Sequence, residues 1–488
     1  MEIKLDSIAS TRDSQRSNDA KSKIDEAEFP YFDNIPSHII ADILLQLPIK
    51  SLLTCKCVSK SWKTLISEPH FDKLYSDRAR ISFIIRTYNH NFMPKNFYHL
   101  ECESEKFEIG RNNPVKLNPL FKLRLCFDKE CLKKDNYWNR KRPFIGCKAR
   151  HDKCGILNSC NGLLCLCHHN NLTPLVILNP TTGDFIRLPE VTKTPKRLNP
   201  TLVRIVGNAG FGFHPKTGEY KVIHMWLKYV KGNRVMPNGV SRPYGWVFEA
   251  MTLEIHTLGT SSWRNVEVDP QFSIKELKHA TCVNGALHWI RFDNWQMSIL
   301  CFNFDSEMLQ LFPSPPCFEN NNNNNEMSYE IIRMGQLSGF LYICCASDQN
   351  ATMWIMKKYG IGESWTNVYN IDISSNRLFP SPFTLCCPLK HFEEGAIILL
   401  YLYKSHCFIY YELEKNRFKV FQIHENPPFF EVIPHIPSLI SLKDVVKGDN
   451  IEVLNIHSRC TKFKLPEENE VLSLVQEFVN TRMKITTM

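Results

Sequence analysis

Short apolar runs separated by turn-forming residues recur between residues 80 and 445, and this recurrence constrains the fold more than any other feature of the 488-residue chain. Residues 179–183 and 214–218 both read x-Pro-x-Thr-Gly, where Pro fixes φ and Gly supplies a positive φ. Each of these turns joins two strand-like runs. The repetition therefore predicts antiparallel sheets built from hairpins.

Further echoes support repeated sheets. Residues 262–264 and 364–366 each carry a Ser-Trp pair after a strand-like run, and residues 283–290 resemble residues 337–343. Spacings of roughly 40 to 60 residues are typical of kelch-like propeller blades, of which we expect about six or seven. The expected units are 80–120, 156–190, 207–268, 280–315, 331–371 and 384–423, with C-terminal strands closing the ring. A pair of β-sandwiches is the alternative, because single strands do not distinguish the two folds.

The two Ser-Trp tryptophans have two interpretations. Trp263 and Trp365 could stack on a ligand, but on repeated strands they are expected to pack between blades.

Residues 32–79 have a different, helical spacing. Apolar side chains recur through Ile39, Ile43 and Leu47 until Pro48, which predicts a first helix. A short helical turn follows, and a third helix ends before Pro69. Three helices this short cannot bury all of their apolar surface among themselves. We expect one flank of the first helix to pack internally and the other to receive a partner helix.

Several short motifs follow one another closely in this segment. It contains Ile35-Pro36, Leu47-Pro48, Ser51-Leu52 and a Val-Ser-Lys-x-Trp run at residues 58–62. This order resembles the F-box, with Ile35 in place of the usual leucine. The resemblance implies docking on a Skp1-like protein, the linker subunit of cullin-type SCF ubiquitin ligases. An ordinary helical subdomain packed on the rest of the chain is the alternative. The implied Skp1 anchors are Ile35, Pro36, Ile43, Leu44, Leu47, Pro48, Leu52, Leu53, Val58 and Trp62.

The strand-rich region carries a second resemblance. Residues 159–165, 178–183, 210–213, 262–264 and 283–289 are similar, in that order, to the F-box-associated domain of plant F-box proteins. That resemblance implies a kelch-like β domain that recognises the protein to be ubiquitylated. No motif fixes the target-binding positions, so they remain unknown. Together the two resemblances imply a non-catalytic substrate-recognition subunit of an SCF-type E3 ligase, linked to the cullin through Skp1. The alternative is a protein- or glycan-binding propeller without a role in degradation.

The expected organisation combines an α module with an all-β domain. Residues 1–28 are expected to be disordered, 29–79 to form a three-helix F-box, and 80–445 to form the β-propeller-like domain. Residues 122–153 are a basic insertion and 316–327 an Asn-rich loop. Residues 446–488 are expected to hold a strand and a helix, because apolar residues between 471 and 478 follow an acidic turn.

The net charge of +9 is concentrated in one segment. Residues 122–153 contain eleven Lys and Arg against four Asp and Glu. This segment is a candidate contact for an acidic partner, a nuclear-import signal or a solvated loop, and nucleic-acid binding is not favoured. No apolar run approaches the roughly 20 residues that span a bilayer, and no signal-peptide core is present. We expect no membrane partner and a cytoplasmic or nuclear location.

Motifs for catalysis are absent from the sequence, which contains no His-Glu-x-x-His, Gly-x-Ser-x-Gly or phosphate-binding loop. The candidate zinc ligands are Cys154, Cys160, Cys165, Cys167, His168 and His169. These residues lack the paired Cys-x-x-Cys spacing of structural zinc sites, so we interpret the cysteines as reduced core residues. The sequence predicts no enzyme activity, no cofactor and no metal.

Overall fold

The computed structural model describes two compact units, which divide the chain at residues 78 and 79. The described residues are 35–77, 82–88, 94–101, 115–116, 118–121, 154–168, 172–191, 203–235, 241–269, 276–293, 296–318, 332–346, 350–372, 386–392, 397–402, 407–412, 417–424, 429–446, 451–455 and 473–477. The expected disordered N-terminus, the basic insertion at 122–153 and most of the Asn-rich loop lie outside them.

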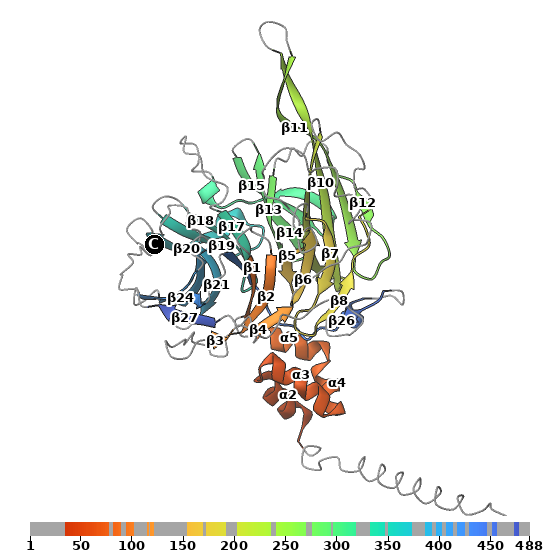
Figure 1. The fold of residues 1–488 in the computed structure, drawn as a ribbon, viewed down its shortest axis with the longest axis vertical. Helices are drawn as coiled ribbons and strands as arrows, with labels where there is room; N and C mark the ends of the chain where they lie inside the picture. Colours follow the sequence, from red (N-terminus) through yellow and green to blue (C-terminus); the bar gives the residue numbers. More distant parts are fainter. Residues whose placement is uncertain are drawn as a thin grey trace, which may run out of the picture. The chain divides into compact units, whose positions relative to one another are not determined.

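The first unit contains four described helices, so the expectation of three is wrong. They are α2 (Ser37–Leu45), α3 (Ile49–Val58), α4 (Lys60–Ile66) and α5 (Pro69–Asp77), shown at the red end of the chain in Figure 1. Pro48 caps the N-terminus of α3, and Pro69 is the first residue of α5. Proline has no backbone N–H, but an N–H in the first turn of a helix has no partner within the helix, so proline loses no hydrogen bond there. Each of these prolines therefore begins a new helix.

The helical unit has its own apolar core. Helix α3 contacts α4, and α2 contacts both α4 and α5. The buried apolar side chains come from all four helices and are Leu44, Leu45, Ile49, Leu52, Ile66, Phe71 and Tyr75. Tertiary packing thus stabilises helices that are too short to persist alone.

The second unit contains six antiparallel sheets in its described part. The first four-stranded sheet consists of β25 (Phe429–Pro434), β1 (Ser82–Tyr88), β2 (Pro94–Glu101) and β4 (Asn118–Phe121). The next in chain order consists of β5 (Cys154–Cys160), β6 (Leu163–His168), β7 (Pro174–Leu178), β8 (Asp184–Arg187) and β26 (Leu454–Asn455). A third consists of β9 (Val203–His214), β10 (Glu219–Val235), β11 (Ser241–Thr257) and β12 (Arg264–Val266).

Three more sheets follow. One consists of β13 (Glu276–Val283), β14 (Ala286–Asp293), β15 (Gln296–Asn303) and β16 (Met308–Phe312). The next consists of β17 (Ile332–Leu337), β18 (Phe340–Ala346), β19 (Asn350–Met356) and β20 (Trp365–Asp372). The last joins β21 (Cys386–Phe392), β22 (Ile397–Leu402), β23 (Cys407–Glu412) and β24 (Arg417–His424) to β27 (Ser473–Glu477) and β3 (Val115–Lys116).

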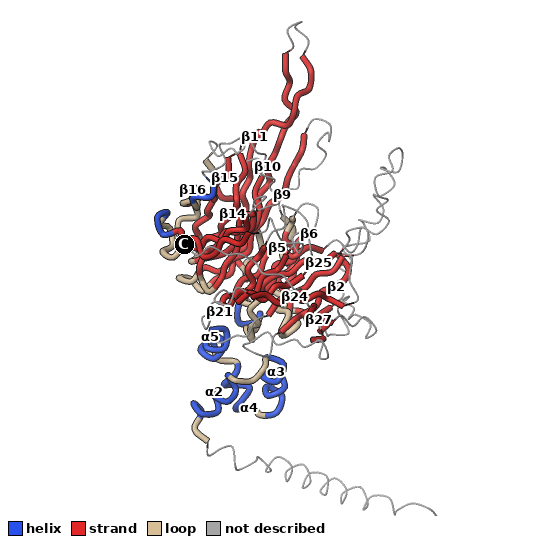
Figure 2. Tube along the Cα trace, turned by 90° about the vertical axis from the view of Figure 1, so that its left-hand side faces the viewer, coloured by secondary structure: helices blue, strands red, loops and turns tan. Residues whose placement is uncertain are grey.

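The sheets adjoin in chain order through their first strands. Strand β5 contacts β9, β9 contacts β13, β13 contacts β17, and β17 contacts β21, while β25 contacts β5. Figure 2 shows these strands in red in a second view of the same unit. Small sheets that adjoin in this way form a propeller-type domain and not two stacked sheets. The six predicted units therefore correspond to the six sheets.

Strand β25, from the C-terminal part, pairs with β1, which is the kind of pairing expected of the C-terminal strands. Two other features of the ends of this unit differ from the sequence expectation. Strand β3 joins the last sheet and leaves the unit at 80–120. The expected helix between 471 and 478 is wrong, because Ser473–Glu477 forms β27 and pairs with β24. The open edge of β24 offers backbone partners, and this long-range pairing overrides the local helical spacing.

Apolar clusters fill the spaces between neighbouring sheets. In the Gly-Phe-Gly-Phe run on β9, small and large residues alternate because the two faces of the strand pack against different neighbours. A Cβ on Gly210 would lie 2.8 Å from Cζ2 of Trp289 on β14, so only glycine lets these two strands approach. Phe211 points to the other side of β9 and joins the cluster that contains residues of β5 and β6. One strand thus serves two interfaces.

Candidate interaction surfaces

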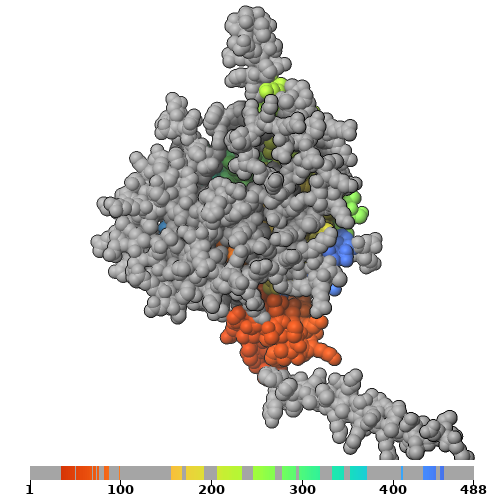
Figure 3. Space-filling model, in the orientation of Figure 1, coloured from red at the N-terminus to blue at the C-terminus, as the bar shows by residue number. Residues whose placement is uncertain are grey.

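The exposed apolar side chains of the helical unit include Ile39, Ile43 and Val58, which are 43%, 53% and 68% exposed. Ile39 and Ile43 are four residues apart on α2 and therefore share one face of that helix. Figure 3 shows the described surface of this unit in red and orange. Exposed apolar side chains on an otherwise packed small unit favour a partner surface.

The predicted Skp1 anchors fall into different environments. Leu44 and Leu52 are buried, at 2% and 0% exposure, so we assign them to the core of the unit and not to a contact surface. Ile43 and Val58 are exposed. The remaining anchors are accessible to different degrees: Pro36 is exposed, while Ile35, Leu47, Pro48, Leu53 and Trp62 are partly buried. The prediction that α2 has an inner and an outer apolar flank is confirmed by Leu44 and Ile43.

The β unit has two kinds of connection at opposite ends of its sheets. In an antiparallel sheet the first and third turns lie at one end and the second turn at the other. In three sheets the first turn is a tight turn with positive φ at both central residues, at Asn161-Gly162, Asn284-Gly285 and Ser338-Gly339. We call the end of the sheets that holds these turns the tight-turn end. Such turns match the twist of the strands they join. The hairpin of β10 and β11 extends from the opposite end (Figure 1).

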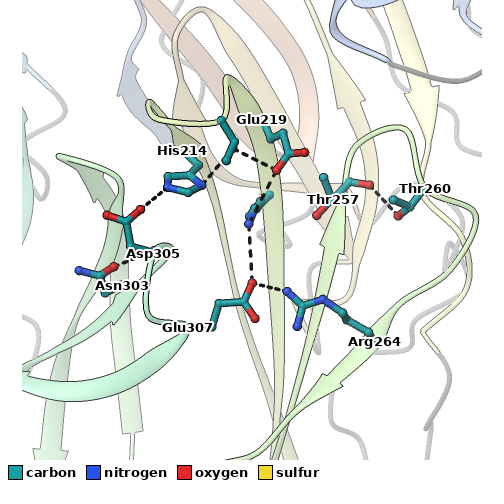
Figure 4. A network of polar contacts seen from close by, with 10 residues as sticks. His214, Glu219, Thr257, Thr260, Arg264, Asn303, Asp305 and Glu307 are labelled. Carbon is teal, nitrogen blue, oxygen red and sulfur yellow. Dashed lines mark hydrogen bonds and ion pairs between the residues drawn. The ribbon is translucent and has the colours of Figure 1, made fainter.

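A network of charged side chains lies at the tight-turn end and joins the third and fourth sheets (Figure 4). Asp305, after β15, binds His214 Nε2 at 2.8 Å and Lys216 Nζ at 2.6 Å. His214 is the last residue of β9, and Lys216 lies in the β9–β10 connection. The hydrogen bond from Lys216, followed by that from His214, lowers the pKa of the Asp305 carboxyl group. Thr217 Oγ1 lies 3.0 Å from the second ring nitrogen of His214.

The second half of this network surrounds Lys221 on β10. The Lys221 side chain is only 8% exposed and lies 3.8 Å from Glu219 and 3.7 Å from Glu307. Arg264 on β12 also binds Glu307, and this hydrogen bond is the main cause of the lowered pKa of that carboxyl group. Each charge in the network faces an opposite charge. The arrangement fixes two sheets together, and the Thr217 hydroxyl donates a hydrogen bond to Glu219 at 3.0 Å.

A cavity of about 500 Å³ lies between β8, the β11–β12 turn and residues 451–454. Its lining includes Arg187, His256 and Glu452 beside apolar side chains. Burial lowers the pKa of His256, and its Nδ1 lies 3.3 Å from the carbonyl oxygen of Ser262. The cavity is therefore lined by a neutral histidine whose Nδ1 is engaged with the backbone.

The two tryptophans predicted to pack between blades do so. Trp263 is 6% exposed, and its Nε1 donates a hydrogen bond to the carbonyl of Pro189, beyond the end of β8. Trp365 is equally buried and donates to the carbonyl of Pro313, beyond the end of β16. Each indole thus links a sheet to the sheet that precedes it, so the inter-blade interpretation is confirmed.

The candidate zinc ligands are placed differently. Cys160, Cys165 and Cys167 are buried, and the structure does not describe the side chains of Cys154, His168 or His169. Among the described residues no group of three or more His, Cys, Asp or Glu side chains is arranged to hold a metal ion. Cys160 and Cys165 belong to the apolar cluster between the second and third sheets.

No helix in the described ranges is long and apolar enough to cross a membrane.

Sequence reasoning missed one structural residue. Asn179 begins the first x-Pro-x-Thr-Gly turn and is fully buried. Its Nδ2 donates to the carbonyls of Ser438 and Ile440 at 3.1 and 2.9 Å, and its Oδ1 accepts from the N–H of Thr181 at 2.9 Å. The asparagine therefore fixes both the turn and a distant C-terminal segment. Its place at the start of a repeated turn was the only signal in the sequence.

Comparison with known proteins agrees with this architecture. The F-box domain family matches residues 32–74, and the F-box associated beta propeller domain family matches residues 125–442. The chain belongs to the family of F-box proteins with an F-box associated beta propeller domain. Three relatives from Arabidopsis thaliana match it over most of its length. The F-box protein At3g07870 is 26% identical over 83% of this chain and 92% of its own length. The putative F-box protein At1g53550 is 24% identical over 82% and 88%, and the F-box protein CPR1 is 22% identical over 83% and 88%.

Proposed function

We propose that this chain is the substrate-recognition subunit of an SCF-type ubiquitin ligase. The helical unit binds a Skp1-like protein, which connects it to a cullin, and the β unit binds the target protein. The observation that carries the proposal is the exposed face of Ile39 and Ile43 on α2, within a unit that matches the F-box family. An apolar helix face of this kind suits a partner that covers it with an apolar groove.

The mechanism is proximity and involves no bond chemistry on this chain. Holding the target and the ligase on one molecule makes ubiquitin transfer effectively intramolecular, which raises the local concentration of the reacting groups. The propeller-type sheets and the β25–β1 pairing support a closed ring that presents loops to the target. The target itself is defined by surface residues for which no motif exists.

The test is direct binding of the full chain to a recombinant Skp1-like protein. Ile43→Asp with Val58→Asp places two charges on exposed positions, so the unit should remain folded. Loss of two apolar contacts of about 1.5–3 kcal/mol each predicts at least an approximately hundredfold weaker Kd. Leu311→Asp is the matched control, because Leu311 is 57% exposed but lies on β16 of the other unit.

Three outcomes decide the assignment. Normal binding by the control and loss by the double variant would support the proposal. Normal Skp1 binding by the double variant would refute these anchors, and no binding by the unchanged chain would favour a recognition protein that acts without the ligase. Leu52→Asp is expected to unfold the helical unit, because Leu52 is fully buried, so it does not report on the contact.

A further inference from the structure

The hairpin of β10 and β11 extends beyond the sheet to which it belongs (Figures 1 and 2). Strand β9 accompanies β10 only as far as the pair Val230–Val203, and β12 accompanies β11 only from Leu253 to Ile255. Within the described part of the chain, the outer edge of β11 from residue 241 to residue 252 therefore has no strand partner. Such an edge presents backbone N–H and C=O groups that can pair with another chain.

Side chains on this ribbon are exposed on both faces. Trp246 is 38% exposed and Val247 is 52% exposed, although neighbouring residues of a strand point to opposite sides. The ammonium group of Lys231 lies 5.9 Å from the centre of the Trp246 ring. A two-stranded ribbon gains little stability from its own packing. Exposed tryptophan beside a cation is instead a typical composition of protein interfaces.

The charge of the β10–β11 hairpin indicates the charge of the partner that it would attract. Residues 228–249 contain Lys228, Lys231, Arg234 and Arg242 but a single acid, Glu249. Glu249 is the extra residue of a β-bulge and is engaged by Lys228 at 2.5 Å. The surplus is therefore positive. A second copy of this hairpin would bring like charges together, whereas an acidic segment would be attracted.

We propose that the outer edge of β11, at residues 246–252, receives an acidic extended segment of a partner protein as an added strand. Backbone pairing provides the affinity, and Trp246 and Val247 contact alternate side chains of the added strand. This inference rests on the proposed function, because the added strand would belong to the target protein. It locates target binding on a particular edge of the β unit.

The probe is a fluorescein-labelled peptide of about eight residues in which Glu alternates with Val and Thr, a length that suits one strand. A second peptide has Lys in place of Glu. A third keeps the acidic side chains but carries N-methyl groups at every second residue, which prevents a backbone ladder. Fluorescence anisotropy gives the Kd of each peptide for the full chain and for the variants Trp246→Ala and Lys231→Glu. Leu311→Ala is the control for an exposed apolar position elsewhere on the β unit.

The acidic peptide should bind at least about tenfold more tightly than either of the other peptides, and more weakly as salt is raised. Trp246→Ala and Lys231→Glu should each weaken it at least about fivefold, while Leu311→Ala should not. Equal binding of all three peptides, no binding of the acidic peptide, or binding unaffected by both hairpin variants would refute the inference. A dimer of the unchanged chain that Trp246→Ala dissociates would refute it too, in favour of self-pairing.

Skp1 binding, measured on the same preparations, separates this inference from the proposed function. Failure of the peptide to bind a chain that binds Skp1 normally would overturn only the β11 edge. Peptide binding by a chain that does not bind Skp1 would support the edge and overturn the adaptor assignment. Hydrogen exchange at β10 and β11 in each variant shows whether the hairpin remains formed.

Discussion

Asn179 should be among the most sensitive polar positions of the β unit. Asn179→Ala removes two hydrogen bonds to the carbonyls of Ser438 and Ile440 and two contacts within the turn, to the N–H groups of Thr181 and Thr182. Each buried carbonyl left without a donor costs about 1–3 kcal/mol, and loss of the turn contacts costs about 1 kcal/mol. The free energy of unfolding should therefore fall by about 3–7 kcal/mol.

Asn303 provides a matched control at an equivalent turn. Its Oδ1 accepts from the N–H of Asp305 at 2.7 Å and of Ser306 at 3.3 Å, as Oδ1 of Asn179 does in its own turn. Asn303→Ala should cost only about 1 kcal/mol, because these hydrogen bonds lie within the turn and reach no distant segment. Urea unfolding followed by tryptophan fluorescence measures both variants, and the midpoint of Asn179→Ala should be the lower of the two by at least about 0.5 M.

A third variant tests the same reasoning from the opposite direction. Asn179→Asp keeps the acceptor for the turn but places a carboxylate oxygen against the two carbonyl groups. It should destabilise the unit at neutral pH at least as much as alanine does, because a buried negative charge then faces two acceptors. Equal unfolding midpoints for Asn179→Ala and Asn303→Ala would show that the bonds to the C-terminal segment contribute nothing, and the argument would fail.

Two further predictions concern the interior of the β unit. Burial lowers the pKa of His224 to about 3, and neither ring nitrogen has a hydrogen-bond partner. Below about pH 6.5 the unfolded chain therefore takes up a proton that the folded chain does not, so the free energy of unfolding falls as pH is lowered. His224→Phe removes this proton uptake. Between pH 7 and pH 5 the variant should lose about 2 kcal/mol less of its free energy of unfolding than the unchanged chain, as measured by urea unfolding. Gly210→Ala should lower the free energy of unfolding by about 1–3 kcal/mol, because its Cβ would clash with Trp289. Gly362→Ala should lower it less, because its Cβ would meet Pro313 at 3.4 Å. Equal urea midpoints for these two variants would contradict the packing argument.

The sheets of the β unit could be predicted because their turns are encoded locally. The turns at 161–162, 284–285 and 338–339 all require positive φ, and Asn, Ser and Gly at these positions report that requirement directly. The strand edges that pair across the chain have no such local signal. This is why the pairing of β3 with β27, and the strand β27 where a helix was expected, could only be seen in the structure.

The helical unit shows a different limit of sequence reasoning. Helical spacing places Ile43 and Leu44 on a wide apolar stripe, but the stripe does not state which flank faces the core. The structure buries Leu44 and leaves Ile43 exposed. That choice depends on where α4 and α5 contact α2, which periodicity within α2 does not specify. Anchors taken from a motif alone therefore mix contact residues with core residues.

The two units also differ in what they offer a partner, and this explains why anchors could be suggested for one and not for the other. In α2 the backbone groups are satisfied within the helix, so a partner must recognise side chains such as Ile39 and Ile43. Side-chain recognition leaves a sequence motif. At the outer edge of β11, from residue 241 to residue 252, no strand of the described residues pairs with the backbone, and backbone pairing accepts many side-chain sequences. An edge of this kind suits variable targets and leaves no motif, so only the strand pairing in the structure reveals it.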